Sequence, residues 1–67
     1  MKRFAAHRVV YAGTVHKPGV VEINNGRVTA HYKLTEEIAM TMWLRGTIEI
    51  LEDDNTLKAY YENALLG

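Results

Sequence analysis

Three histidines are the side chains in this sequence best suited to binding a metal ion or transferring a proton: His7, His16 and His31. No two of them are spaced as H-x-H or H-x-x-x-H. His7 and His31 meet only if the first and third strands of a sheet are neighbours. A metal site would then need a third ligand, such as Glu22, and a supporting shell. A metal or small-molecule site at His7 and His31 is one hypothesis, and scattered, half-exposed histidines are the simpler interpretation.

Other reactive patterns are missing from the sequence. The acidic runs Glu36-Glu37 and Glu52-Asp53-Asp54 lack the alternating ligand spacing of a calcium loop, so we interpret them as solvated charges at helix starts. Serine and cysteine, the two commonest nucleophiles, are both absent. There is also no G-x-S-x-G, P-loop or G-x-G-x-x-G. The sequence therefore predicts a protein that is not an enzyme, with no catalytic residue, cofactor or metal.

Large side chains near the middle and the end of the sequence are candidates for an interaction surface. Trp43 follows Met42, and a tryptophan beside methionines suits either a binding surface or the core of a small domain. Tyr60 and Tyr61 are adjacent and cannot both point fully inward, so at least one lies at the rim of the core or in an interface. We take Met42, Trp43 and Tyr60 as the candidate contacts.

The size of the chain makes stability its main problem. A single domain over residues 1–67 has a hydrophobic fraction of 48%, which is ordinary for a globular protein. So short a chain buries little surface, and without cysteine it cannot use disulfides. Self-association is the remaining source of stability. No apolar run reaches the roughly 20 residues of a membrane helix, and His7 and Arg8 interrupt any signal peptide. These features predict a cytoplasmic protein that does not enter a membrane.

The charges are divided between the two halves of the sequence. Residues 1–33 carry six basic side chains and one acidic one, a balance of +5, and residues 34–67 carry two basic and seven acidic, a balance of −5. The halves either pack together and cancel within one molecule, or pair reciprocally between copies. Zero net charge disfavours a nucleic-acid partner, because phosphate binding needs a basic face.

The strongest local signal is a hairpin from Val20 to Leu34. Asn25-Gly26 suits its turn, because this pair favours the type I′ geometry that matches the twist of the strands. The register then places Ile23 opposite Val28. Continuing it predicts the pairs Val21–Ala30, Gly19–Tyr32, Glu22–Thr29 and Val20–His31, with one apolar face.

A first strand and a turn precede this hairpin. Residues Ala5 to Tyr11 favour a strand, with His7, Val9 and Tyr11 on one face. Lys17-Pro18-Gly19 is typical of a turn.

The remainder predicts a helical turn, two extended segments and a closing helix. Thr35 caps a short helical turn that reaches Ala39. Extended segments cover Thr41–Leu44 and Thr47–Leu51, with Gly46 marking a bulge or bend and Ile48 and Ile50 facing inward. The acidic run up to Asn55 suits the start of a helix over Thr56–Leu66. Its apolar stripe comprises Leu57, Tyr60, Tyr61, Ala64 and Leu65.

Parts of the sequence resemble a known family. The run Val9-Val10-Tyr11-Ala12-Gly13, the run Gly19 to Val28 and the segment Trp43-Leu44-Arg45-Gly46-Thr47-Ile48 resemble the N-terminal accessory β-domain of amidohydrolase-superfamily enzymes. The resemblance implies a stand-alone small β domain without the catalytic barrel. The family's H-x-H metal motif and catalytic aspartate have no counterpart, so no functional residue carries over. The unpaired edges of such a domain could be covered by a second copy.

Together these features predict a mainly β (α+β) domain. We expect a small, curled, mostly antiparallel sheet of four to five strands with one C-terminal helix across it. Its function is predicted to be that of a homodimer or a module that binds another protein, with metal or small-molecule binding at His7 and His31 as the alternative. The predicted core comprises Val9, Tyr11, Val21, Ile23, Val28, Ala30, Tyr32, Leu34, Trp43, Ile48, Ile50, Leu57, Tyr61 and Leu65.

Overall fold

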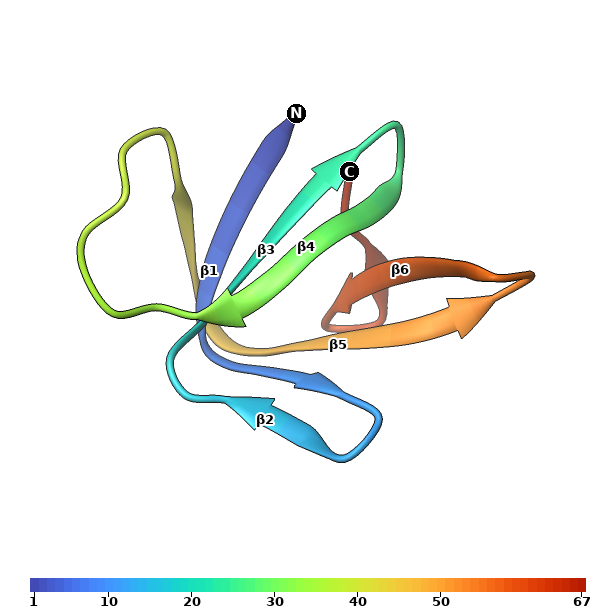
Figure 1. Cartoon of the computed structure of the whole chain (residues 1–67), viewed down its shortest axis with the longest axis horizontal. Helices are drawn as coiled ribbons and strands as arrows, with labels where there is room; N and C mark the ends of the chain where they lie inside the picture. The colour runs from blue at the N-terminus through green and yellow to red at the C-terminus, as the bar shows by residue number, and fades with distance from the viewer.

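The computed structural model describes all 67 residues and consists of strands, turns and loops without a helix. One mixed sheet has the strand order β4-β3-β1-β5-β6-β7, with β2 also paired to β1 (Figure 1). The mainly β class is confirmed, although seven strands form rather than four or five. The structure contains no helix that could span a membrane. The strands are β1 (Lys2–Tyr11), β2 (Thr14–His16), β3 (Gly19–Asn24), β4 (Arg27–Lys33), β5 (Met42–Asp53), β6 (Thr56–Tyr61) and β7 (Ala64–Leu65).

The central strand β1 has neighbours along both edges. On one edge it pairs antiparallel with β3 and then with β2, and on the other it pairs parallel with β5. The β1–β5 register shifts between Ala6 and Arg8, opposite Gly46, whose φ is 111°. Both strands bend sharply in this region (Figure 1). The predicted bulge or bend at Gly46 is confirmed.

The bend also changes which face of β1 is buried. Ala6 and Val9 are both fully buried in the same core cluster, whereas His7 between them is exposed. The prediction that His7 shares a face with Val9 and Tyr11 is therefore wrong, because strict alternation does not continue through the irregularity.

Four hairpin turns have exactly two residues, and all eight of these residues have positive φ, as a type I′ turn requires. Asn25-Gly26 is the predicted one. Because each of these turns is this tight, the two strands that it joins fold back on each other directly. The other three turns are Ala12-Gly13, Asp54-Asn55 and Glu62-Asn63.

The predicted C-terminal helix over Thr56–Leu66 is wrong. Asp54-Asn55 forms a turn instead of starting a helix, and residues Thr56–Tyr61 pair with β5 along their whole length. The same segment also alternates, since Leu57, Ala59 and Tyr61 face the core. A short helix is marginal on its own, whereas this strand completes a ladder beside β5, whose Ile48 and Ile50 are buried in the core.

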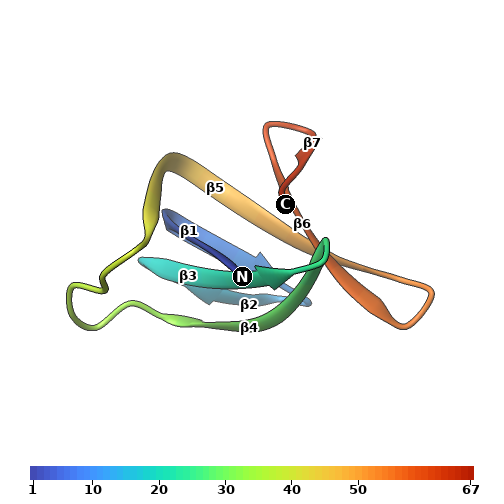
Figure 2. The same ribbon diagram turned by 90° about the horizontal axis from the view of Figure 1, so that it is seen from above.

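The predicted helical turn from Thr35 to Ala39 is also wrong. An eight-residue loop, Leu34–Thr41, leads from β4 to β5 instead. The loop must carry the chain from one edge of the sheet to the far side of β1, where β5 runs parallel to β1. Seen from above, the loop projects on one side of the molecule and the β5–β6 hairpin on the other (Figure 2).

The β3–β4 hairpin keeps its predicted tip but not its predicted register. Ile23 pairs with Val28 as expected, and the register then shifts between Glu22 and Ile23. Thr29 is the extra residue, and its hydroxyl donates to the Glu22 carbonyl oxygen at 3.2 Å. The four pairs predicted beyond this point are wrong. The observed pairs are Glu22–Ala30, Val21–His31, Val20–Tyr32 and Gly19–Lys33.

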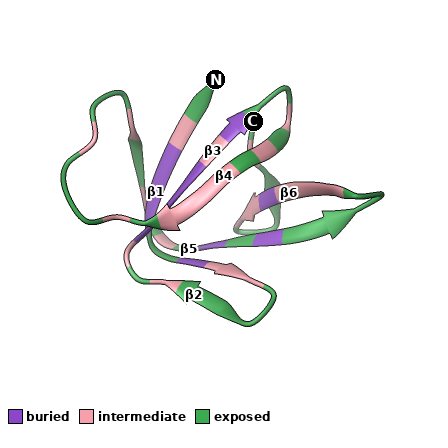
Figure 3. Cartoon of the chain, viewed as in Figure 1, coloured by how far each residue is buried: buried purple, intermediate pink, exposed green.

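The core cluster is formed by residues of β1, β3, β5 and β6, the strands that carry the buried segments in Figure 3. The predicted core members Val9, Val21, Ile23, Ile48 and Ile50 are buried. Two predicted members are wrong, because Trp43 is 50% exposed and Leu65 is 53% exposed. The buried residues missed from the sequence are Phe4, Ala5, Ala6, Val20 and Ala59. The remaining predicted members, Tyr11, Val28, Ala30, Tyr32, Leu34, Leu57 and Tyr61, are partly buried.

Candidate functional site

All three methionines of the chain line one groove at the end of the sheet where β1 begins. Met42 pairs with Phe4, so both side chains are on the core face of the sheet, and both line the groove. The volume is about 830 Å³. Met1 is 71% exposed, Met40 92% and Met42 60%. The parallel pairing of β1 with β5 therefore gathers flexible apolar side chains that leave much of their surface in water.

Trp43 is on the opposite face of the sheet from Met42. It pairs with Ala5, which is buried, and its ring meets the His7 ring edge-on with centroids 5.1 Å apart. A second hollow here shares Thr41 with the methionine groove. The hollow is lined by Ala5, Leu34, Glu37, Ile38, Ala39, Thr41 and Trp43.

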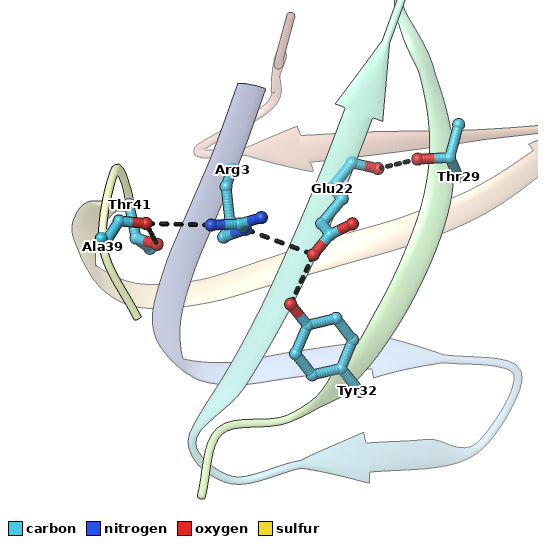
Figure 4. Close-up of polar contacts among 6 residues, drawn as sticks. All are labelled: Arg3, Glu22, Thr29, Tyr32, Ala39 and Thr41. Carbon is cyan, nitrogen blue, oxygen red and sulfur yellow. Dashed lines mark hydrogen bonds and ion pairs between the residues drawn. The ribbon is translucent and has the colours of Figure 1, made fainter. Parts of the chain in front are cut away.

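A polar network holds the Leu34–Thr41 loop in place (Figure 4). The Arg3 Nη1 donates to the Ala39 carbonyl oxygen at 2.9 Å, and its Nε donates to Glu22 Oε2 at 3.2 Å. The Tyr32 hydroxyl donates to the same Glu22 oxygen at 2.5 Å. The hydrogen bond to the Glu22 carboxylate raises the pKa of Tyr32, and desolvation adds to the effect. Arg3 thus links the sheet to the residue that precedes Met40.

The surroundings of Met40 are unfavourable for a methionine in a single molecule. Its φ is 56°, in the left-handed region that disfavours residues with a Cβ. Its side chain is almost entirely in water. Strained backbone at an exposed apolar side chain is a reason to look for a function at that position.

The histidines do not form the pair predicted from the sequence. His7 lies against Trp43, and its Nδ1 accepts a hydrogen bond from the Gly46 backbone N–H at 3.0 Å. His31 instead meets His16, and His16 Nε2 and His31 Nδ1 share a hydrogen bond 3.0 Å long. Partial burial, followed by the neighbouring His16, lowers the pKa of His31. No cluster of three or more histidine, cysteine, aspartate or glutamate side chains forms.

Tyr60 does not join Met42 and Trp43. It lies on β6 beside a shallow hollow shared with Val10 and Glu49. Its neighbour Tyr61 packs against the core and donates its hydroxyl to the Arg45 carbonyl oxygen at 2.5 Å. Of the three predicted contacts, Met42 and Trp43 therefore lie at the same end of the sheet on opposite faces, and Tyr60 lies apart from both.

Met1 and Met40 are the members of this surface that the sequence did not suggest. They are separated from each other by four strands and most of the loop, and they meet only because β5 returns alongside the start of β1. The presence of three methionines in a short chain was the available signal. It could not reveal their proximity without the β1–β5 pairing.

Comparisons with protein-family models, curated proteins and solved structures return no match to this chain. The resemblance to the accessory β-domain of amidohydrolases therefore stays a prediction.

Proposed function

We propose that this chain is a non-enzymatic interaction module that self-associates through the Met–Trp patch, defined as Met1, Met40, Met42 and Trp43. The observation that supports this most directly is the grouping of four large, at least half-exposed apolar side chains at one end of the molecule. Methionine adapts its shape to a partner, and tryptophan and methionine are enriched in protein interfaces.

The charges beside the patch favour a second copy of the same chain as the partner. Lys2 borders the methionine groove, and Glu37 borders the Trp43 hollow. Both side chains are exposed, and neither takes part in an ion pair within the chain. In a two-fold dimer, the groove of one copy can face the hollow of the other, so that Lys2 and Glu37 meet twice.

The small buried core of this domain also favours self-association. Only 11 of 67 residues are buried, and domains of this size gain stability from oligomerisation. A standard interface covers about 800 Å² per partner, which is roughly a sixth of the 4562 Å² exposed by one molecule. A dimer would therefore cover the patch and its surroundings at an ordinary interface size.

Sedimentation equilibrium from micromolar to millimolar concentration tests the proposal. The wild-type chain is expected to show a reversible monomer–dimer equilibrium. Met40→Glu should abolish it, because it places a charge in the patch while the Met40 side chain supports little of the monomer fold. Val15→Glu is the matched control: it adds the same charge at another exposed apolar position, on β2, and should leave dimerisation unchanged. A strictly monomeric wild type, or equal loss in both variants, would refute the proposal.

A further inference from the structure

Two imidazole nitrogens face each other between β2 and β4. His16 ends β2 and His31 lies in β4, and these strands are not hydrogen-bonded neighbours. His16 Nε2 and His31 Nδ1 are nonetheless 3.0 Å apart. The Tyr11 ring packs against His31, with centroids 5.1 Å apart. Three aromatic rings from three strands therefore form one cluster.

The bulge at Thr29 creates this arrangement. Without the extra residue, His31 would pair with Val20, whose side chain is on the outer face. With it, His31 pairs with Val21, which belongs to the core cluster. His16 pairs with Val9, another core residue. Paired residues in adjacent strands share a face, so the bulge places both histidines on the same side of the sheet.

We propose that His16 and His31 form a two-histidine binding site for a divalent transition-metal ion of the Cu²⁺ type. Ligand nitrogens lie about 2.0 Å from such a metal. Two nitrogens at a right angle around it are then about 2.8 Å apart, and at a tetrahedral angle about 3.3 Å. The 3.0 Å between the two hydrogen-bonded nitrogens lies between these values, so both tetragonal Cu²⁺ or Ni²⁺ and tetrahedral Zn²⁺ fit the separation once the ion replaces the shared proton.

The ligand chemistry favours copper among these ions. Imidazole suits Cu²⁺, Ni²⁺ and Zn²⁺, and Cu²⁺ binds a given nitrogen site most strongly. Structural Zn²⁺ sites use four protein ligands, whereas no third histidine, cysteine or carboxylate joins this pair. Water completes the coordination of the ion in the site proposed here. Glu22 does not take part, because its carboxylate is engaged by Arg3 and Tyr32.

Titration of the full chain with Cu²⁺, followed by calorimetry and electron paramagnetic resonance, tests this site. The wild type is expected to bind one Cu²⁺ per chain with two nitrogen donors in the spectrum. His16→Gln and His31→Gln should each weaken binding more than tenfold. His7→Gln removes a histidine that lies elsewhere, against Trp43, and should leave the affinity within twofold of the wild type. Unchanged affinity in the His16 and His31 variants would overturn the assignment.

A second measurement on the wild type does not depend on whether the variants fold. Substoichiometric Cu²⁺ broadens the nuclear resonances of the rings that bind it. The His16 and His31 ring signals should broaden together and before those of His7. Equal broadening of all three histidines, or of His7 first, would overturn the site.

Discussion

Glu22 is the residue at which three segments of the chain are joined by polar side chains. Its carboxylate accepts from Arg3 of β1 and from Tyr32 of β4, and its carbonyl oxygen accepts from Thr29. The register shift is what makes this network, because it moves Tyr32 onto the face where Glu22 points. Arg3 also donates to the Ala39 carbonyl oxygen in the loop, so a substitution at Glu22 should change the position of the loop residues in the Met–Trp patch.

The Tyr32–Glu22 hydrogen bond predicts a loss of stability in alkaline solution. The pKa of Tyr32 in the folded chain lies above its ordinary value of 10.0, because ionisation would break its hydrogen bond to a carboxylate. The stabilisation is therefore complete below pH 10.0 and is lost as the pH rises through the folded-state pKa. Tyr32→Phe should lower the free energy of unfolding by about 1 kcal/mol at neutral pH, and this difference should vanish at high pH.

Urea unfolding across this pH range measures the effect. Tyr60→Phe is the control, because Tyr60 is a partly buried tyrosine outside the network. The prediction would be contradicted if the difference in unfolding free energy between the wild type and Tyr32→Phe stayed constant into strongly alkaline solution.

At the scale of elements, local turn chemistry was readable from the sequence and long-range pairing was not. The Asn25-Gly26 tip, the Ile23–Val28 pair and the inward Ile48 and Ile50 all follow from local patterns and are confirmed. The bulge at Thr29 depends on what packs against each face, which the hairpin sequence does not contain. The segment after Asn55 fits both a helical and a strand period, and β5 as a partner decides between them.

The candidate sites were also predictable only where their residues are close in the sequence. Met42 and Trp43 were identified because they are adjacent in the sequence, whereas Met1, Met40 and the partner of His31 required the topology. Trp43 was assigned to the core on its size alone. Its strand position opposite the small residue Ala5 leaves the ring half exposed instead.

The start of β3 gives a prediction about strand packing. Gly19 is buried against β1, and a Cβ added there would lie 2.6 Å from Val9 Cβ and 2.8 Å from His16 Cβ. Val9 is fully buried and cannot move aside. Gly19→Ala should therefore cost about 3 kcal/mol of unfolding free energy, measured by urea denaturation.

Gly26→Ala is the matched control for this substitution. A Cβ at Gly26 meets nothing within 4 Å, and only its φ of 77° opposes the change. The expected cost is about 1 kcal/mol. An equal or smaller cost for Gly19→Ala would show that close packing of β3 on β1 does not limit stability.

At the scale of the whole molecule, the two halves of the charge distribution do not simply cancel. Only Arg3–Glu22 and Lys58–Asp53 form ion pairs within the chain, and each pair lies within one half of the sequence. The remaining charges stay available for interactions between molecules. This agrees with the reciprocal pairing proposed for the dimer, in which Lys2 of one copy meets Glu37 of the other.

Charge reversal tests that arrangement. Lys2→Glu alone and Glu37→Lys alone should each weaken homodimerisation about thirtyfold, because two exposed pairs become repulsive at roughly 1 kcal/mol each. Mixing the two variants should restore affinity, since both contacts of the mixed dimer are again between opposite charges. Sedimentation of the separate and mixed samples measures this. A mixture no tighter than its components would rule out the Lys2–Glu37 contact.

The Leu34–Thr41 loop has a further consequence for how this protein could change. Every other connection between strands has two residues. An insertion into one of these short connections would disturb the pairing of the strands on either side. The eight-residue connection has no such constraint, and it carries Met40 and Glu37. Recognition could therefore diversify by altering this one segment, with the rest of the chain serving as an unchanged scaffold.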